Sequence, residues 1–165
     1  MSTASTRSAY EPPSYRYNDV ARAEGQMLFD KAWRGIMAQG RKSRSTNGCV
    51  YQLDSSCYCA IGHNLTDRAR AHLASDPRSN NAAVHDLGRL LVDYPGDLGT
   101  LWPHRTLLNA IQLAHDEPSE SQGPAYLEPF LLRMQTVAKT FSLSLATLQD
   151  AVRASGLFKQ PTQTS

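Results

Sequence analysis

The chain has 165 residues, a length typical of a single domain, and 41% of them are hydrophobic. Charged residues make up 19% and the net charge is +2, which argues against global disorder and against a strong general attraction to nucleic acid or an anionic membrane. No apolar run is typical of a signal peptide or a bilayer-spanning helix, and three cysteines is an odd number for a disulfide-bonded secreted domain. We therefore expect a cytoplasmic protein that has free thiols and does not enter a membrane.

The two ends of the chain differ in composition from the rest. Residues 1–17 are rich in Ser, Thr, Pro and Tyr, which predicts a disordered N-terminal arm. Residues 159–165 predict a disordered tail for the same reason. We expect residues 18–158 to form a single globular helical domain, because no repeat or linker divides them.

The first helix is expected to begin after Asn18, as its N-cap, and to end at Gly40. Phe29, Trp33 and Ile36 follow the spacing of a buried helical stripe. The apolar members of this helix are Val20, Met27, Phe29, Trp33, Ile36 and Met37. The pattern predicts a helix that packs one face on the core.

The next segment, NGCVYQLDSSCYCAIG, has β-branched and aromatic residues around a polar turn. It predicts a β-hairpin in which residues 49–53 pair with residues 57–61. Side chains alternate between the faces of a strand, so the odd-numbered residues, Leu53 included, share one face. The alternation therefore directs Cys49, Cys57 and Cys59 toward the core.

Helical spacing then returns. Thr66 is expected to cap a short helix that turns Ala69 and Leu73 inward, and residues 80–92 predict another helix. A longer helix is expected after Pro103. The inner side of that helix carries Leu107, Leu108, Ile111 and Ala114 or His115.

The strongest helical pattern covers residues 126–141, with Pro129 expected in the first turn because Pro deeper in a helix costs about 3 kcal/mol or more. Ser144 is expected to cap a last helix, which Gly156 ends. The predicted fold is α+β and mainly α-helical, with about five or six helices and one small β-hairpin.

Four residues of the hairpin region, Cys49, Cys57, Cys59 and His63, are potential zinc ligands, since zinc takes thiolate and imidazole donors in tetrahedral geometry. Structural zinc sites usually draw their ligands from two compact pairs, and here one residue separates Cys57 from Cys59 without a second pair. The alternative is that the cysteines are small hydrophobic side chains of the core. We favour this alternative and expect no metal and no cofactor.

No catalytic set stands out in the sequence. A Cys–His nucleophile pair is conceivable, yet no spacing selects one of the histidines. These are His63, His72, His85, His104 and His115. His85 and His115 each precede an Asp, but neighbouring helix residues point about 100° apart and are not expected to face each other. No catalytic residue is therefore predicted.

A basic stretch, Arg34, Arg41, Lys42 and Arg44, contains no acidic residue. Three of these cations share a loop with hydroxyl side chains, a combination suited to phosphate groups or an acidic protein surface. The loop lacks the residue order of a phosphate-binding loop. The alternative interpretation is a solvated loop without a ligand.

Three segments, FDKAWRGIMAQG, CVYQLDSSCYCAIGHNL and LLNAIQLAHD, are followed by a closing amphipathic helix. In this order they resemble a group of small bacteriophage and mobile-element proteins without an assigned activity. The matching positions are Gln39, Gly40, Cys49, Tyr51, Cys59, Ala60, Ile61, Gly62, His115 and Asp116. The resemblance covers residues 29–141. This chain differs from the group in having Cys57 as an additional thiol and in its long N-terminal arm. It implies a mobile-element setting and a shared fold, without a mechanism.

We therefore expect a phage-type accessory protein that binds a host macromolecule, in the first place a host protein such as a component of a defence system, which it would inhibit. The arm with Tyr10, Tyr15 and Tyr17 is a candidate contact segment. Two alternatives stay open. One is a nucleic-acid-binding protein that uses the basic stretch. The other is a zinc or thiol site on the cysteine-rich hairpin.

Overall fold

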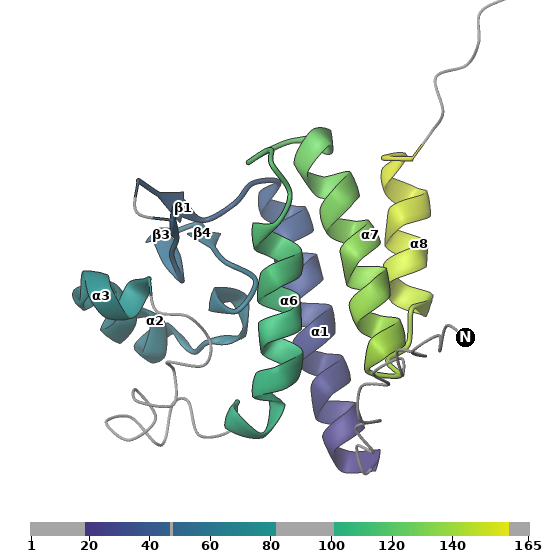
Figure 1. Cartoon of the computed structure of the whole chain (residues 1–165), viewed down its shortest axis with the longest axis horizontal. Helices are drawn as coiled ribbons and strands as arrows, with labels where there is room; N and C mark the ends of the chain where they lie inside the picture. Colours follow the sequence, from purple (N-terminus) through teal and green to yellow (C-terminus); the bar gives the residue numbers. More distant parts are fainter. Residues whose placement is uncertain (1–18, 47, 82–100, 159–165) are drawn as a thin grey trace, which may run out of the picture.

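A computed structural model describes residues 19–46, 48–81 and 101–158 of the chain (Figure 1). These residues contain six α-helices and two small antiparallel sheets of two strands each. The predicted mainly helical α+β fold is thus confirmed. Within the described ranges, no helix combines the length and apolar character needed to cross a bilayer.

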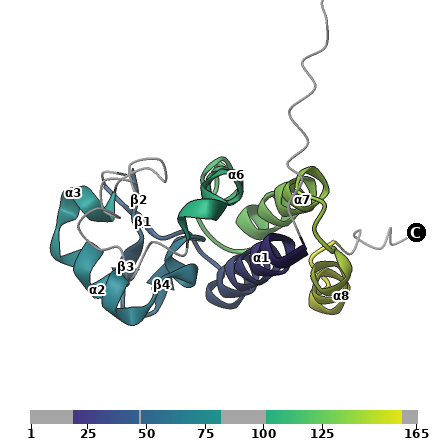
Figure 2. The same ribbon diagram turned by 90° about the horizontal axis from the view of Figure 1, so that it is seen from below.

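Four helices lie side by side and form what we call the helical half (Figures 1 and 2). They are α1 (Asp19–Gln39), α6 (Arg105–Asp116), α7 (Pro124–Thr140) and α8 (Ala146–Ser155). α1 contacts each of the other three, and α6 also packs on α7. α1 is therefore the central helix of this half.

Apolar side chains fill the space between these helices. The predicted inner stripes of α1 and α6 are confirmed, since Phe29, Ile36, Leu107 and Ile111 are all fully buried. Val20 and Met27, expected as part of the α1 stripe, are 68% and 72% exposed. At about 100° per residue, both positions point to the opposite side of the helix from Phe29. The prediction was wrong for these two residues because they do not share the period of the stripe.

Two glycines end helices as predicted. Gly40 follows α1 and Gly156 follows α8, each with φ of +68°, in the left-handed region that glycine adopts at low cost. Ser144 also serves the start of α8, because its Oγ accepts the Ala146 N–H at 3.3 Å. The helix itself begins at Ala146, so Ser144 acts from one residue further out than expected.

Pro129 lies inside α7, which corrects the prediction that it occupies the first turn. The helix begins at Pro124 and not near Tyr126, so Pro124 takes the first-turn position. Pro129 removes the N–H that would bond to the carbonyl of Ala125, and Ala125 is exposed. The helix continues because that carbonyl lies at the surface.

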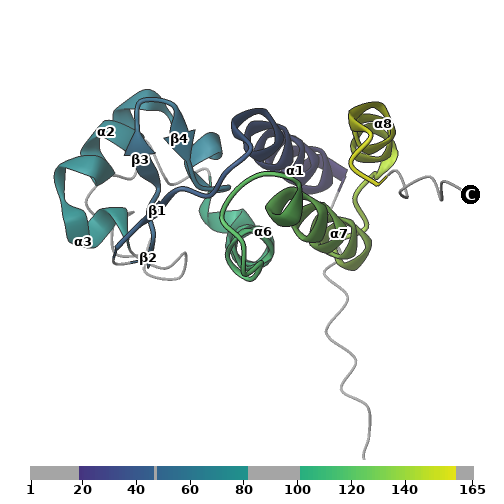
Figure 3. The ribbon, with the colours of Figure 1, turned by 90° about the horizontal axis from the view of Figure 1, so that it is seen from above.

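Residues 41–46 and 48–81 form the hairpin half, which lies on the side of the row of helices away from α8 (Figure 3). Its strands are β1 (Arg44–Ser45), β2 (Gly48–Cys49), β3 (Gln52–Asp54) and β4 (Cys57–Tyr58). β1 pairs with β2 and β3 pairs with β4. The helical elements are η1 (Gly62–Asn64), α2 (Asp67–Ser75) and α3 (Pro77–Asn80).

The predicted single hairpin of residues 49–53 and 57–61 is replaced by two shorter ones. The chain leaves strand geometry between Cys49 and Gln52, where the Val50 N–H donates to the Ser43 carbonyl and the Tyr51 N–H to the Asn80 carbonyl. These bonds to other segments take the donors that a continuous strand would have used. Cys49 therefore belongs to a different hairpin from Cys57.

The second turn is also one residue shorter than predicted. Asp54 pairs with Cys57, so the turn contains Ser55 and Ser56, and Asp54 Oδ1 accepts the Ser56 N–H at 2.8 Å. The register then shifts by one residue between Gln52 and Asp54, which leaves Leu53 without a paired residue, and Leu53 is 41% exposed and not buried. Cys57 remains buried as predicted.

The start of α2 agrees with the sequence. Thr66 Oγ1 accepts the Ala69 N–H at 3.1 Å, and Ala69 and Leu73 are buried. A short helix, η3 (Trp102–His104), precedes α6. Of the predicted helix 80–92, residues 82–92 lie outside the described residues, as do the N-cap Asn18, the arm and the tail.

Two close approaches hold the hairpin half in place. A Cβ added at Gly62 would overlap the carbonyl oxygen of Tyr51, so the chain after β4 passes directly against the chain before β3. At the other end, the Lys42 N–H donates to the Ser121 carbonyl at 2.7 Å, and the Gly123 N–H donates to the Gly40 carbonyl at 2.9 Å. This second contact fixes the start of the hairpin half against the α6–α7 connection.

Candidate metal centre

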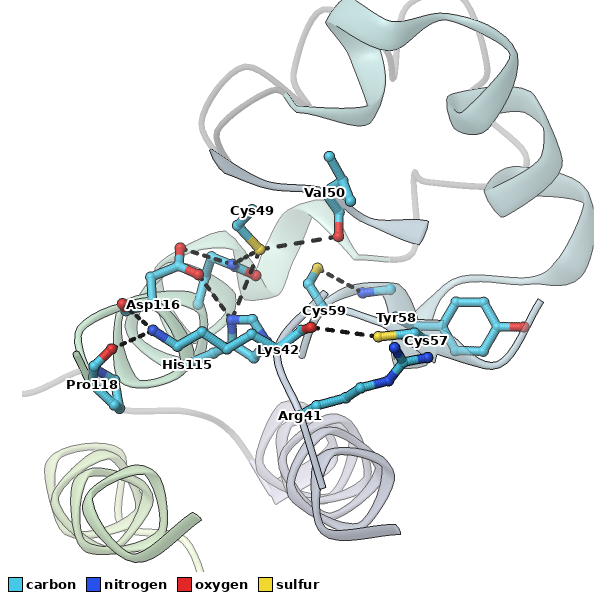
Figure 4. Close-up of polar contacts among 12 residues, drawn as sticks. Arg41, Lys42, Cys49, Val50, Cys57, Tyr58, Cys59, His115, Asp116 and Pro118 are labelled. Atoms are coloured by element: carbon cyan, nitrogen blue, oxygen red, sulfur yellow. Dashed lines mark hydrogen bonds and ion pairs between the residues drawn. The ribbon is translucent and has the colours of Figure 1, made fainter. Parts of the chain in front are cut away.

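Three potential metal ligands meet where the hairpin half touches the end of α6 (Figure 4). Cys49, His115 and Asp116, which we call the Cys-His-Asp cluster, have ligand atoms that all lie within 4.8 Å of one another. His115 Nδ1 is 2.8 Å from Asp116 Oδ1 and 3.8 Å from Cys49 Sγ. The three donor atoms thus converge on one point.

Each ligand is placed by its own element. His115 continues the buried stripe of α6, is fully buried itself, and meets the rings of Tyr126 and Phe130 edge-on. Asp116 is the last residue of α6, and Cys49 is the last residue of β2. The expectation that His115 and Asp116 do not face each other is wrong, because α6 ends here and no following helical turn confines the short Asp side chain.

Gln112 connects the two outer ligands. Its Nε2 donates to Cys49 Sγ at 3.1 Å and to Asp116 Oδ2 at 2.9 Å. Sequence reasoning missed this residue, although Gln112 and Asp116 stand four apart on a helix, the spacing at which two side chains meet. Among the described residues, His115 Nε2 and Gln112 Oε1 are buried without a hydrogen-bond partner.

The neighbours of each group shift its affinity for protons. Burial lowers the pKa of His115, but the contacts with Asp116 and Cys49 outweigh it, so the pKa lies above its usual value. Burial raises the pKa of Asp116, while His115 and Gln112 together bring it below its usual value. The adjacent Cys59 thiol and burial hold the pKa of Cys49 far above that of a free thiol. These shifts favour the charged forms of His115 and Asp116 and the thiol form of Cys49.

The spacing of the donors is close to that of a zinc site. Tetrahedral zinc with its usual bond lengths places sulfur and nitrogen about 3.6 Å apart and nitrogen and oxygen about 3.3 Å apart. The corresponding distances here are 3.8 Å and 2.8 Å. These two distances lie within about 0.5 Å of the zinc values, and the sulfur and carboxylate oxygen lie within 4.8 Å of each other.

A cavity of about 240 Å³ opens beside the cluster. Its walls are Lys42, Ser43, Arg44 and Gly48 together with the three members of the cluster. A fourth position on an ion held by the cluster would therefore face this cavity. Ser43 is fully buried and its Oγ donates to the Cys57 carbonyl, so it is not free to coordinate.

Lys42 is a buried part of this wall and only 5% exposed. Its ammonium donates to the carbonyl oxygens of Asp116, at 2.8 Å, and Pro118, and lies over the ring of Tyr126. Burial lowers the pKa of Lys42, the charge of Asp116 raises it, and Arg44 lowers it again, with a net decrease. The interpretation of this segment as a uniformly solvated loop does not hold at Lys42 and Ser43.

The other predicted binding cations lie apart from one another. Arg41 pairs with Asp54 at 2.9 Å. Arg34 stacks on the ring of Trp33 and borders a different depression between α1 and α8. Arg44 is exposed at the mouth of the cavity. The structure therefore brings together Lys42 and Arg44 of the predicted set, and places Arg34 elsewhere.

The predicted four-residue zinc set is not assembled. Cys57 Sγ contacts the Lys42 carbonyl at 3.5 Å, and Cys59 Sγ accepts the Gly62 N–H at 3.3 Å. His63 Nε2 is 2.9 Å from Gln39 Oε1. In the part of the chain that the structure describes, Cys49 is the one member of that set grouped with other potential ligands. Its partners come from α6, far away in the sequence.

Comparisons with known proteins found no matching family model, no matching curated protein and no matching solved structure. The resemblance to phage proteins therefore stays a prediction. The candidate centre rests on the geometry of its own residues.

Proposed function

We propose that this protein binds a zinc-type divalent ion through Cys49, His115 and Asp116 and uses the ion to activate a bound water molecule. The observation that carries the proposal is the convergence of a thiol, an imidazole and a carboxyl within 4.8 Å. Structural zinc sites have four protein ligands, whereas catalytic sites have three and keep one open position. The cavity beside the cluster supplies room at that position.

The choice of metal follows from the donors. A thiolate and an imidazole favour zinc and related transition ions over magnesium or calcium, which prefer oxygen. The ion would take the place of the protons on Cys49 and on the His115–Asp116 pair. Gln112 would then hold the sulfur and the carboxylate in position from outside the ligand set. This proposal departs from the expectation that the chain needs no cofactor.

A thiol nucleophile activated by His115 is the competing chemistry, suggested by the 3.8 Å contact between Cys49 and His115. In such a relay the imidazole uses one nitrogen for the nucleophile and the other for the carboxylate. Here Nδ1 faces both Cys49 and Asp116, while Nε2 has no partner among the described residues. The raised pKa of Cys49 also keeps it a thiol. Metal binding fits this geometry better.

The binding of a host protein or of nucleic acid stays a prediction. Exposed Arg44 is compatible with both partners. The internal bonds of Lys42 and the ion pair of Arg41 leave less free positive charge than the sequence suggested. A metal centre and a macromolecular partner do not exclude each other.

Cobalt(II) tests the centre because it replaces zinc and is coloured. The purified chain should bind one equivalent of Co²⁺ and show a thiolate-to-cobalt charge-transfer band in the near ultraviolet. Cys49→Ser should lose this band, and His115→Gln should weaken cobalt binding. Cys57→Ser is the matched control, since Cys57 is a buried thiol outside the cluster.

Two results would contradict the proposal. One is the absence of stoichiometric cobalt binding in equilibrium dialysis. The other is a charge-transfer band that survives in Cys49→Ser and disappears in Cys57→Ser. Thermal unfolding of each variant without metal shows whether it is folded, so that a lost ligand can be told from a lost fold.

A further inference from the structure

The cavity beside the Cys-His-Asp cluster has two cations in its wall, Lys42 and Arg44. The ammonium of Lys42 has three N–H donors, and two are used by the carbonyl oxygens of Asp116 and Pro118. Arg44 is exposed, and its side chain has no hydrogen bond or ion pair to another described residue. The guanidinium of Arg44 therefore remains for a ligand, while buried Lys42 adds a positive charge to the wall.

The charges around the cavity favour an anion. The two charges of a bound divalent ion are matched by the Cys49 thiolate and the Asp116 carboxylate. Lys42 and Arg44 then stand as a surplus of two positive charges beside the ion. A phosphate group carries about −1.5 to −2 charge at neutral pH, which balances this surplus. An acetate-type carboxylate balances half of it.

The shape of the cavity favours a small ligand. Its volume of about 240 Å³ is below the roughly 300–1,000 Å³ typical of pockets that take drug-sized molecules. Guanidinium groups pair with two phosphate oxygens at once, and Arg44 stands at the mouth with its side chain exposed. A phosphate group or a short phosphate ester fits this arrangement better than a long polymer.

We propose that the cavity binds a phosphate-type oxyanion, with one oxygen replacing the water at the open position of the ion and others on Arg44, beside the positive charge of Lys42. The inference rests on the proposed metal centre and names its ligand class. The ion and Arg44 both belong to the lining of the cavity, so each contributes to the affinity for the anion. Inorganic phosphate is therefore the probe of this site.

The test uses the cobalt-loaded full chain titrated with inorganic phosphate at constant ionic strength. The visible spectrum of cobalt should change on addition of phosphate and reach saturation, because an oxygen enters the coordination shell. Arg44→Gln should raise the apparent Kd for phosphate at least tenfold while cobalt binding stays unchanged. Arg153→Gln, an exposed substitution on α8 outside the cavity, should bind phosphate as the wild type does.

The outcomes separate this inference from the proposed function. If the wild type binds no cobalt, the metal centre itself is contradicted and the inference falls with it. If cobalt binds and phosphate leaves the spectrum unchanged, the oxyanion site alone is contradicted. Equal phosphate affinity in the wild type and in Arg44→Gln would contradict the proposed contact between Arg44 and the anion. Acetate that binds as tightly as phosphate contradicts the charge argument.

Discussion

Two regions of this molecule hold their chain in place by different interactions. α7 and its partners bury apolar side chains such as Phe130, Leu131 and Met134 against one another. In the hairpin half, buried side chains such as Ile61 and Leu65 join the same core, but its strands have only two or three residues and polar groups also fix them to the helices. Gln39 at the end of α1 illustrates this, since its amide donates to the Tyr58 carbonyl and accepts the Tyr58 N–H.

The difference explains where the candidate site lies. Apolar packing is non-directional and fixes helices as bodies, whereas hydrogen bonds fix individual atoms. His115 comes from the apolar face of α6, and Cys49 comes from a segment positioned by hydrogen bonds. A metal site must hold its three donor atoms in position to within a few tenths of an ångström. The packed helices keep His115 rigid, and the hydrogen bonds of the hairpin half orient Cys49.

The largest expected effect comes from the apolar region. Phe130 is fully buried and stacks on Tyr126 with ring centroids 5.9 Å apart. Phe130→Ala should lower the free energy of unfolding by about 3–5 kcal/mol, because it leaves a cavity in the core. Leu132, on the same helix but 53% exposed, is the control, and Leu132→Ala should change stability by less than about 0.5 kcal/mol. Equal losses in urea denaturation would contradict the role of apolar packing here.

The hairpin half depends on backbone contacts instead. Gly62→Ala should cost more than about 2 kcal/mol, because the new methyl group would displace the Tyr51 carbonyl. Gly40 is the matched control, since its φ is +68° but no atom lies within 4 Å of an added Cβ. Asn tolerates the left-handed region, so Gly40→Asn should cost less than about 1 kcal/mol. A larger loss of thermal stability in Gly40→Asn than in Gly62→Ala would contradict the role of the close approach at Gly62.

The polar contacts around the cluster should affect binding more than stability. Gln112→Leu keeps much of the bulk of the side chain and removes the donors to Cys49 and Asp116. Its cobalt affinity should fall roughly 10- to 100-fold, the usual effect of losing a group that orients metal ligands. Asn109→Ala, an exposed change on the same helix, should leave the affinity unchanged. Competition with a coloured chelator measures both, and equal affinities would exclude the orienting role of Gln112.

The last expected effect concerns the contact between the two halves. His63 stands against Gly35 of α1, and burial and then the charge of Arg70 lower its pKa to about 4 from an ordinary 6.5. The unfolded chain therefore takes up a proton at this position at a higher pH than the folded chain does. Stability from neutral His63 should be complete above pH 6.5 and be lost as the pH falls toward about 4. His63→Gln should flatten this part of the stability–pH curve, and an unchanged slope would refute the assignment.

The helical half was largely predictable from the sequence. The spacing of Leu107, Leu108 and Ile111 identified the inner side of α6, and it placed Ala114 or His115 on that side; both are buried. Periodicity carries this information because each buried side chain of a helix repeats at a fixed angle. Where an apolar residue falls outside the period, as Met27 does, its exposure follows from the same rule.

The candidate site was not predictable in the same way. Its geometry depends on where the chain leaves β2 after Cys49. That point is decided by contacts with distant segments, such as the bond from the Tyr51 N–H to the Asn80 carbonyl. Local spacing grouped Cys49 with Cys57 and Cys59, whereas the structure groups it with the end of α6.

The separation between Cys49 and His115, 66 positions along the chain, has a consequence for the kinetics of folding. Each hairpin and the α6–α7 pair join segments close in sequence and can form early, whereas contacts of large sequence separation form late. The contact between the Gly123 N–H and the Gly40 carbonyl is of this late kind. In a refolding experiment, the colour of a cobalt ion on the cluster would therefore appear late. The rate of its appearance would measure how fast the two halves dock.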